Sequence, residues 1–274
     1  VLTDFIEKAP EDFSDATYSA LRERSVGLGV MGLHSLFQQK MIPFESVMSK
    51  VWNKKIFEHI QKEVDQASRD MANERGPCPD AADYGINERF SNKTAIAPTA
   101  SISIICGGTS PGIEPIAANS YTHKTLSGSF NVRNKYLEKT LEKYGKNDSE
   151  TWSSITTNQG SVYHLDFLTQ EEKDVFKTAF ELDQRWIVEL GAERTPYISQ
   201  AQSINIFVPA DIHKRELHQI HFQAWKKGLK SLYYCRSKSI QRAENVNDAK
   251  LTDVTANVYK SKNQQNEEQE YEEC

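Results

Sequence analysis

Residues 203–235 read SINIFVPADIHKRELHQIHFQAWKKGLKSLYYC, and this stretch decides the fold class. Residues 203–208 alternate isoleucine and valine with asparagine and phenylalanine, which is the period of a β-strand. Residues 212–229 predict a helix, and residues 232–235 follow it directly as a second short strand. Strands separated by helices of about ten residues or more are typical of a parallel sheet covered by helices. We therefore predict an α/β fold, as part of either a barrel or an open sheet.

Further helices are expected upstream of this stretch. Apolar residues recur every three or four positions across residues 46–75, which predicts one long helix that ends at Gly76. Residues 25–39 carry a second apolar stripe and also predict a helix, although it would contain Gly29 and Gly32. Because glycine lowers helix propensity, we expect this segment to approach a neighbouring element closely.

The middle of the chain predicts another helix and another strand. Thr169-x-x-Glu172 is a capping box, so a helix is expected from residue 169 to about residue 190. Residues 94–97 predict a strand that leads into a loop of small residues.

Composition and charge limit the classes of partner. The 274 residues contain 33 Lys and Arg against 38 Asp and Glu, a formal net charge of −5, which lacks the basic excess that drives nucleic-acid binding. No apolar run approaches the length of a membrane span. Four separated cysteines without zinc-site spacing indicate reduced thiols. We therefore expect a cytoplasmic location, no metal bound by this chain, and neither a nucleic-acid nor a membrane partner.

The C-terminal segment differs in composition from the rest of the chain. Residues 261–274 are polar and acidic and contain no aliphatic side chain, so they cannot bury enough surface to offset the entropy of ordering. We predict a folded domain over residues 1–259 and a flexible tail over residues 260–274. The sequence opens at Val1, which suggests a chain that starts inside a longer protein.

The loop after residues 94–97 is a candidate phosphate site. Small residues allow backbone N–H groups to converge on an anion, and Thr and Ser hydroxyls add donors. It is not a Walker loop, because the GxxxxGK[ST] pattern is absent. Taken alone, an ordinary strand-to-turn connection is the simpler explanation. The candidate residues are Pro98, Thr99, Ala100, Ser101 and Ile102.

Two tyrosines and a terminal cysteine are candidates for redox chemistry. Adjacent residues of a strand point to opposite faces, so Tyr233 and Tyr234 are expected to place one ring in the core and one outside. The alternative is a process that oxidises the phenols themselves. Cys274 lies on the predicted tail, where an exposed thiol could exchange with a disulfide, or it is an incidental residue.

Five segments occur in an order that is more specific than any one of them. Together they resemble the C-terminal part of the large, catalytic subunit of aerobic class I ribonucleotide reductase, and the resemblance runs from about residue 22 to the tail. The segments are Arg24-Ser-Val-Gly-Leu-Gly-Val-Met-Gly-Leu-His34, Pro98-Thr-Ala-Ser-Ile102, Gly112-Ile-Glu-Pro115, Tyr121-Thr-His-Lys-Thr-Leu-Ser-Gly128 and Gly228-Leu-Lys-Ser-Leu-Tyr-Tyr234.

The resemblance implies a fold, an activity and roles for the candidate residues. It implies the C-terminal half of a ten-stranded α/β barrel, with an acidic tail, that takes part in reducing ribonucleotides to deoxyribonucleotides. Residues 98–102 match the loop that binds substrate phosphates. Tyr233 and Tyr234 match a stacked pair that passes a radical toward a cysteine on the barrel's finger loop. Cys274 matches a tail cysteine that regenerates the active-site dithiol.

The same resemblance implies partners and cofactors. The family's radical cysteine, with its flanking Asn and Glu, and its substrate-reducing cysteine pair have no counterpart in this chain, and a second tail cysteine is also missing. We therefore expect either a split-gene product that needs an N-terminal partner chain, or a truncated sequence. Further expected partners are the small subunit with its metal-tyrosyl radical, thioredoxin or glutaredoxin, and the ribonucleotide substrate. Nucleotide effectors would bind the N-terminal part, and this chain would bind no cofactor. The alternative is a non-enzymatic interaction module or inactive fragment.

Overall fold

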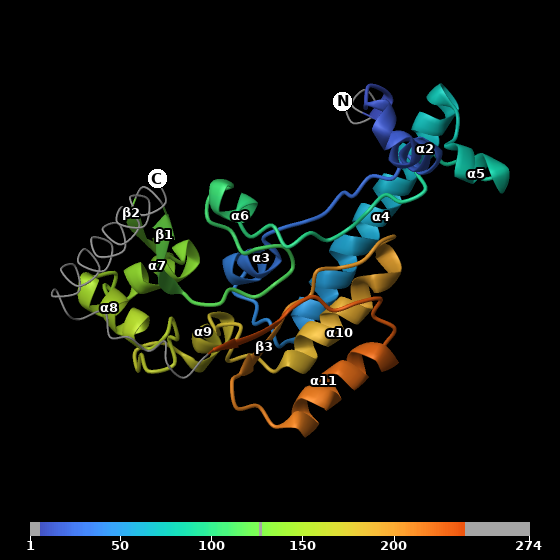
Figure 1. Cartoon of the computed structure of the whole chain (residues 1–274). Coiled ribbons are helices and arrows are strands. Elements are labelled where there is room, and N and C mark those ends of the chain that lie inside the picture. Colours follow the sequence, from blue (N-terminus) through green and yellow to red (C-terminus); the bar gives the residue numbers. More distant parts are fainter. Residues whose placement is uncertain (1–5, 126–127, 239–274) are drawn as a thin grey trace, which may run out of the picture. The chain divides into compact units, whose positions relative to one another are not determined.

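Four extended segments lie side by side in parallel and form the frame of the structure. In this computed structural model, which describes residues 6–125 and 128–238, Leu28 pairs with Thr94, and Ile96 pairs with Gln202. Further along, β3 (Ile206–Pro209) pairs in parallel with β4 (Cys235–Lys238). Each segment neighbours the one before it in the chain, and helices connect them (Figure 1). The expected α/β class is confirmed.

Helices and one hairpin fill the connections between the segments. Strands β1 (Ser120–Thr125) and β2 (Gly128–Arg133) pair antiparallel. The helical elements are η1 (Glu11–Phe13), α2 (Ser14–Glu23), α3 (Leu33–Gln39), α4 (Val47–Arg75), α5 (Pro79–Asp83), α6 (Ile102–Ile105), α7 (Lys135–Lys143), α8 (Ser149–Thr157), α9 (Gln170–Val175), α10 (Gln184–Arg194), η2 (Thr195–Tyr197) and α11 (Lys214–Lys226). None of the helices that these described residues form combines the length and apolar character needed to cross a lipid bilayer.

The long helix predicted over residues 46–75 is confirmed as α4. The Ser46 hydroxyl caps its first turn by accepting a hydrogen bond from Ser49 N at 3.1 Å. The helix ends at Gly76, whose φ of 79° lies in the region that favours glycine. Helix α10 packs against both α4 and α11 (Figure 1).

The helix predicted over residues 25–39 is wrong in its first half. Only α3 is helical, whereas Leu28 belongs to the first extended segment. A Cβ at Gly29 would lie 2.5 Å from Ala95 O, so this glycine lets two neighbouring backbones approach closely. The close approach expected from the glycines is confirmed, but it joins extended segments.

The helix predicted from residue 169 is two helices. The capping box at Thr169 and Glu172 is present and begins α9, which ends at Val175. The chain then turns inward, where Ala179 is fully buried and donates its N–H to Ile116 O at 2.7 Å. The Asp183 side chain caps the start of α10. The strand predicted over residues 232–235 also begins later than expected, since β4 starts at Cys235.

The apolar side chains gather into two clusters. The larger cluster joins α3, α4, α10 and α11 to the extended segments, and its fully buried members include Phe37, Ile204 and Leu190. The smaller cluster joins α7, α8 and α9 around Leu137 and Ile155. The extended segments therefore belong to the larger core, with helices packed against them.

A buried arginine joins the main helices to the third extended segment. Arg194 is 1% exposed, and its Nη1 donates to Asn53 Oδ1 at 3.1 Å while its Nε donates to Gln202 Oε1 at 2.5 Å. Asn53 Nδ2 in turn donates to Leu190 O at 3.0 Å, and Gln202 Nε2 donates to Gly191 O at 3.1 Å. This network links α4, α10 and the segment that leads into β3.

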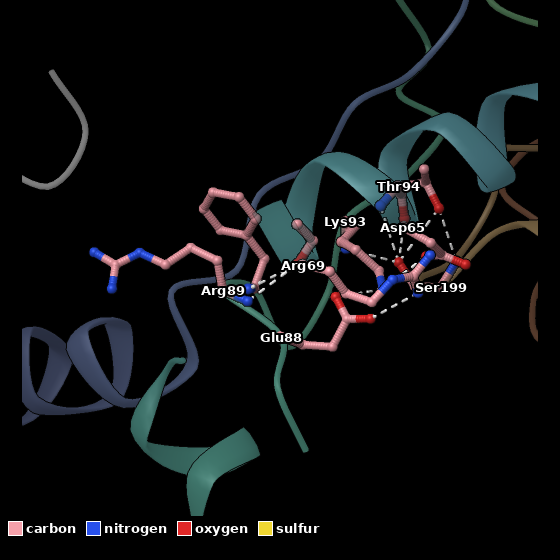
Figure 2. Close-up of polar contacts among 9 residues, drawn as sticks. Asp65, Arg69, Glu88, Arg89, Lys93, Thr94 and Ser199 are labelled. Atoms are coloured by element: carbon pink, nitrogen blue, oxygen red, sulfur yellow. Dashed lines mark hydrogen bonds and ion pairs between the residues drawn. The ribbon is translucent and has the colours of Figure 1, made fainter. Parts of the chain in front are cut away.

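Ion pairs and a reciprocal hydrogen-bond set anchor the second extended segment (Figure 2). Lys93 Nζ lies 2.7 Å from Asp65 Oδ1 and 3.2 Å from Glu88 Oε2. Ser199 Oγ accepts from both Lys93 N and Thr94 N at 2.9 Å, and Thr94 Oγ1 accepts from Ser199 N at 2.9 Å. The segment is therefore fixed to α4 on one side and to the chain after α10 on the other.

Replacing Asn53 with alanine tests the buried network. Asn53→Ala leaves Arg194 Nη1 without its acceptor in the core and removes the side-chain donor to Leu190 O, so the free energy of unfolding should fall by about 2–4 kcal/mol. Urea unfolding of the full chain measures this. Lys54→Ala, at the exposed neighbouring position on α4, is the control and should change stability by less than about 0.5 kcal/mol. Equal effects of the two substitutions would contradict the role of the network.

Candidate functional site

The candidate phosphate loop follows the second extended segment and runs into α6. Pro98 and Thr99 are partly buried, whereas Ala100, Ser101 and Ile102 are exposed. Thr99 has a φ of 50°, an uncommon value for a β-branched residue, so the loop turns sharply here. Ser103 then closes the turn, because its backbone N donates to Thr99 O at 2.9 Å and its Oγ donates to Ala100 O at 3.2 Å.

The loop is joined to the segment that contains the Gly112-Ile-Glu-Pro115 motif. Thr99 Oγ1 accepts a hydrogen bond from Gly112 N at 2.7 Å. Gly112 has a φ of 48°, and a Cβ there would lie 3.0 Å from Ala97 O. A side chain at residue 112 would therefore push the two segments apart, which explains why glycine occupies this position.

Helix α3 holds the other side of this segment. The backbone N of Ser35 donates to Ser110 Oγ at 3.1 Å, and the backbone N of Ser110 donates to Ser35 Oγ at 2.8 Å. His34 Nδ1 accepts from Ile116 N at 3.0 Å, and its ring is fully buried against Phe44. Burial lowers the pKa of His34 to about 3, so the imidazole is neutral at ordinary pH. A neutral ring is required, because Nδ1 must accept a hydrogen bond.

The two tyrosines lie side by side just before β4. Their ring centroids are 4.1 Å apart at an interplanar angle of 52°, and the side chains are 47% and 56% exposed. The expectation that one ring enters the core is therefore wrong. Backbone hydrogen bonds hold the pair, from Tyr233 N to Ile204 O at 2.8 Å and from Tyr234 N to Asn205 Oδ1 at 3.0 Å.

Electrostatic contacts connect the tyrosines to each other and to an arginine. A hydrogen bond with the Tyr234 phenol raises the pKa of Tyr233. Arg236 Cζ lies 6.0 Å from the centroid of the Tyr234 ring, within range of a cation–π contact.

Two buried polar residues lie between the loop and the tyrosines, and sequence analysis assigned neither a role. Glu114 is 5% exposed and Asn205 is 1% exposed. Burial raises the pKa of Glu114, while the neighbouring Asn205 and Arg236 oppose this shift. The available sequence signal was an asparagine inside an apolar strand and a glutamate inside a recognised motif.

The structure therefore connects Thr99 of the loop to the tyrosine pair through a series of short contacts. Thr99 contacts Gly112, Glu114 faces Asn205, and Asn205 binds Tyr234. Cys274 and the predicted tail over residues 260–274 lie outside the described residues. Within residues 6–125 and 128–238, the structure contains no group of three or more His, Cys, Asp or Glu side chains suited to a metal ion.

Comparison with known proteins defines the class of this chain. The profile of the family described as ribonucleotide reductase, barrel domain, matches residues 1–84 and 80–235. The chain therefore belongs to the ribonucleotide reductase barrel-domain family.

Individual relatives show how much of a large subunit the chain represents. It is 48% identical over 249 residues to the ribonucleoside-diphosphate reductase large subunit of Invertebrate iridescent virus 6, covering 89% of this chain and 26% of that protein. It is 42% identical to the large subunit of Invertebrate iridescent virus 3, over 92% of this chain and 40% of the relative. The chain thus spans less than half the length of these relatives.

A solved structure agrees with the sequence comparison. The Actinobacillus ureae class Id ribonucleotide reductase alpha subunit matches with a TM-score of 0.80 and 39% identity, over 86% of this chain and 44% of that one. At this identity, the similarity supports both the fold and the family.

The acid dependence of stability tests the role of His34. The unfolded chain takes up a proton near the ordinary pKa of 6.5, whereas the folded chain does so only near pH 3. The free energy of unfolding therefore falls as the pH drops through this window, by about 2 kcal/mol between pH ~6.5 and ~5. His34→Gln removes this contribution and should flatten the curve. Urea unfolding across this range measures the effect, and identical slopes in both proteins would contradict the neutral buried state.

Proposed function

We propose that this chain supplies the C-terminal half of the catalytic barrel of a ribonucleoside-diphosphate reductase large subunit. In this proposal, the four parallel segments are part of a ten-stranded α/β barrel. The observation that carries it is the contact between the Tyr233 and Tyr234 rings, which lie 4.1 Å apart and are half exposed. Family membership and the relatives' names support the reaction class.

The loop from Pro98 to Ile102 binds the substrate phosphates in this proposal. The exposed positions of Ala100 and Ser101 leave their backbone and hydroxyl groups accessible to an anion. Thr99 uses its oxygen to hold Gly112, which fixes the loop conformation, and its hydroxyl proton remains available as a donor. The loop would therefore bind the phosphates through backbone and hydroxyl hydrogen bonds rather than through a lysine.

The tyrosine pair transfers the radical in this proposal. Each phenol gives up one electron and one proton together and regains both when the radical moves on. Ring contact shortens the electron path, and the adjacent phenol groups, whose interaction raises the pKa of Tyr233, keep the path for the proton short. The half-exposed rings are accessible to a partner chain.

In this proposal, the remaining parts of the reaction are supplied by residues outside this sequence. The small subunit, with a metal-tyrosyl radical centre, supplies the oxidising equivalent. An N-terminal part of the large subunit carries the radical cysteine, the reducing cysteine pair and the nucleotide effector sites. We propose that the thiolate of Cys274, on the tail over residues 260–274, attacks the disulfide of the oxidised pair, which forms a mixed disulfide and releases one thiolate of the pair. The dithiol of thioredoxin or glutaredoxin then reduces the mixed disulfide, so that Cys274 and the second cysteine of the pair are both released as thiols and the reductant becomes oxidised.

Removing one phenolic oxygen tests the radical role. Tyr234→Phe keeps the ring but removes the transferable proton, so turnover in the complex reconstituted with both partner chains should fall at least about 100-fold, with unchanged unfolding. Tyr163→Phe changes another exposed tyrosine and should retain turnover. Full activity of Tyr234→Phe would refute radical transfer. A chain that binds its partners but never supports turnover would instead favour a non-enzymatic module.

A second substitution tests the tail. Cys274→Ser should leave one turnover of the prereduced complex intact but abolish multiple turnovers driven by thioredoxin or glutaredoxin, because the oxidised pair is no longer regenerated. A small dithiol that reaches the pair directly should restore turnover. Cys106→Ser, which replaces an exposed cysteine of the described part, is the control. Unimpaired multiple turnover of Cys274→Ser would rule out the exchange.

A further inference from the structure

Two buried polar atoms beside the tyrosines lack completed hydrogen bonds. Glu114 Oε1 and Asn205 Nδ2 have no partner of good geometry among the described residues, although Asn205 faces the Glu114 carboxyl group. Both side chains are more than nine-tenths buried. Buried polar groups without partners are destabilising, so their presence here calls for a specific reason.

The position of Asn205 suggests that reason. Its Oδ1 accepts from Tyr234 N at 3.0 Å, so its Nδ2 must point the other way. A carboxylate only accepts hydrogen bonds, and Glu114 therefore favours the orientation in which Nδ2 faces it. That orientation is the one that leaves Oδ1 on Tyr234 N. If the Asn205 amide rotated by half a turn, its Nδ2 would face the N–H of Tyr234, and the hydrogen bond to Tyr234 would be lost because both groups are donors.

Glu114 is itself fixed relative to the phosphate loop. Its backbone N donates to Pro111 O at 3.0 Å, and Gly112, two residues earlier, donates to Thr99 Oγ1 at 2.7 Å. Arg236 is the cation that acts on the Glu114 carboxyl group, and it also lies near the Tyr234 ring. A displacement of the loop would thus be transmitted to Glu114 over a short path.

We propose that Glu114 and Asn205 form a positioning pair in which the Glu114 carboxylate orients the Asn205 amide and Asn205 holds the Tyr234 backbone, so that its ring stays against Tyr233. Neither residue touches the reacting atoms. Only the catalytic consequence rests on the proposed function, since the placement of the two rings is a property of the chain itself. Through Thr99 and Gly112, the pair also couples the phosphate loop to the tyrosines.

A reversal of donor and acceptor provides a direct test. Glu114→Gln keeps the volume but allows the Asn205 amide to rotate. Asn205→Asp keeps an acceptor for Tyr234 N but sets two carboxyl groups against each other. The double variant restores a matched contact, because the glutamine amide at 114 donates to one carboxylate oxygen at 205 and Tyr234 N donates to the other. A general packing role would not produce this rescue.

The first readout follows the tyrosines in the full chain and needs no activity. The pKa of Tyr233, raised by its hydrogen bond with Tyr234, is measured by NMR with carbon-13-labelled tyrosine, and Tyr233→Phe identifies the signal. Both single variants should bring this pKa back toward the ordinary tyrosine value, and the double variant should raise it again. Asn119→Asp, at another asparagine that is 1% exposed, controls for loss of stability and should leave the pKa of Tyr233 unchanged.

The second readout is turnover of the reconstituted complex. Each single variant should lose roughly 10- to 100-fold, and the double variant should regain most of the loss. An unchanged Tyr233 pKa in both single variants, or a double variant no better than either, would overturn the positioning pair. If Asn205→Asp does not fold, the isosteric Glu114→Gln decides through the Tyr233 pKa alone. A complex with no turnover even when unmodified would refute the proposed function, and the NMR result would still decide the pairing.

Discussion

The buried guanidinium of Arg194 is the interaction on which the arrangement of the main helices depends. Burial lowers its pKa to about 9, so the group still carries its charge at neutral pH and needs polar partners inside the core. Asn53 on α4 and Gln202 on the third extended segment supply them. A shift of any of these elements would leave a charge buried without compensation, which is a severe destabilisation.

This constraint extends to the functional site through strand register. Gln202 pairs with Ile96, and Asn205 lies three residues further along the same extended segment. Side chains of an extended segment alternate between two faces, so a slip of one residue would turn Asn205 away from Glu114 and Tyr234. The same pairing fixes Ile96, which leads into the phosphate loop. The buried arginine, through Gln202, therefore helps to fix the register of the segment that leads into the phosphate loop and of the segment that carries Asn205.

The sequence predicted the features that depend on local pattern and missed those that depend on distant contacts. The long helix over residues 46–75 has a regular apolar period and a serine cap, so its sequence was sufficient. Residues 25–31 also contain apolar residues at helical spacing, but close approach to Ala95 favours an extended backbone there. The capping box at Thr169 correctly marked a helix start, whereas its end was set by the burial of Ala179 against Ile116. Asn205 had no local signal of its partner, because Glu114 lies far away in sequence.

The tyrosine pair shows why alternation failed where it mattered most. The expectation of opposite faces assumed that both residues lie within a strand, but β4 begins one residue later, at Cys235. Tyrosines are usually fixed by packing their rings into a core, whereas here each tyrosine residue is about half exposed. Their position is set instead by backbone hydrogen bonds to Ile204 and Asn205. Because the pair is held through its backbone, the two rings stay in contact while both phenols remain accessible. A pair fixed by burial in the core would keep the contact but lose the access.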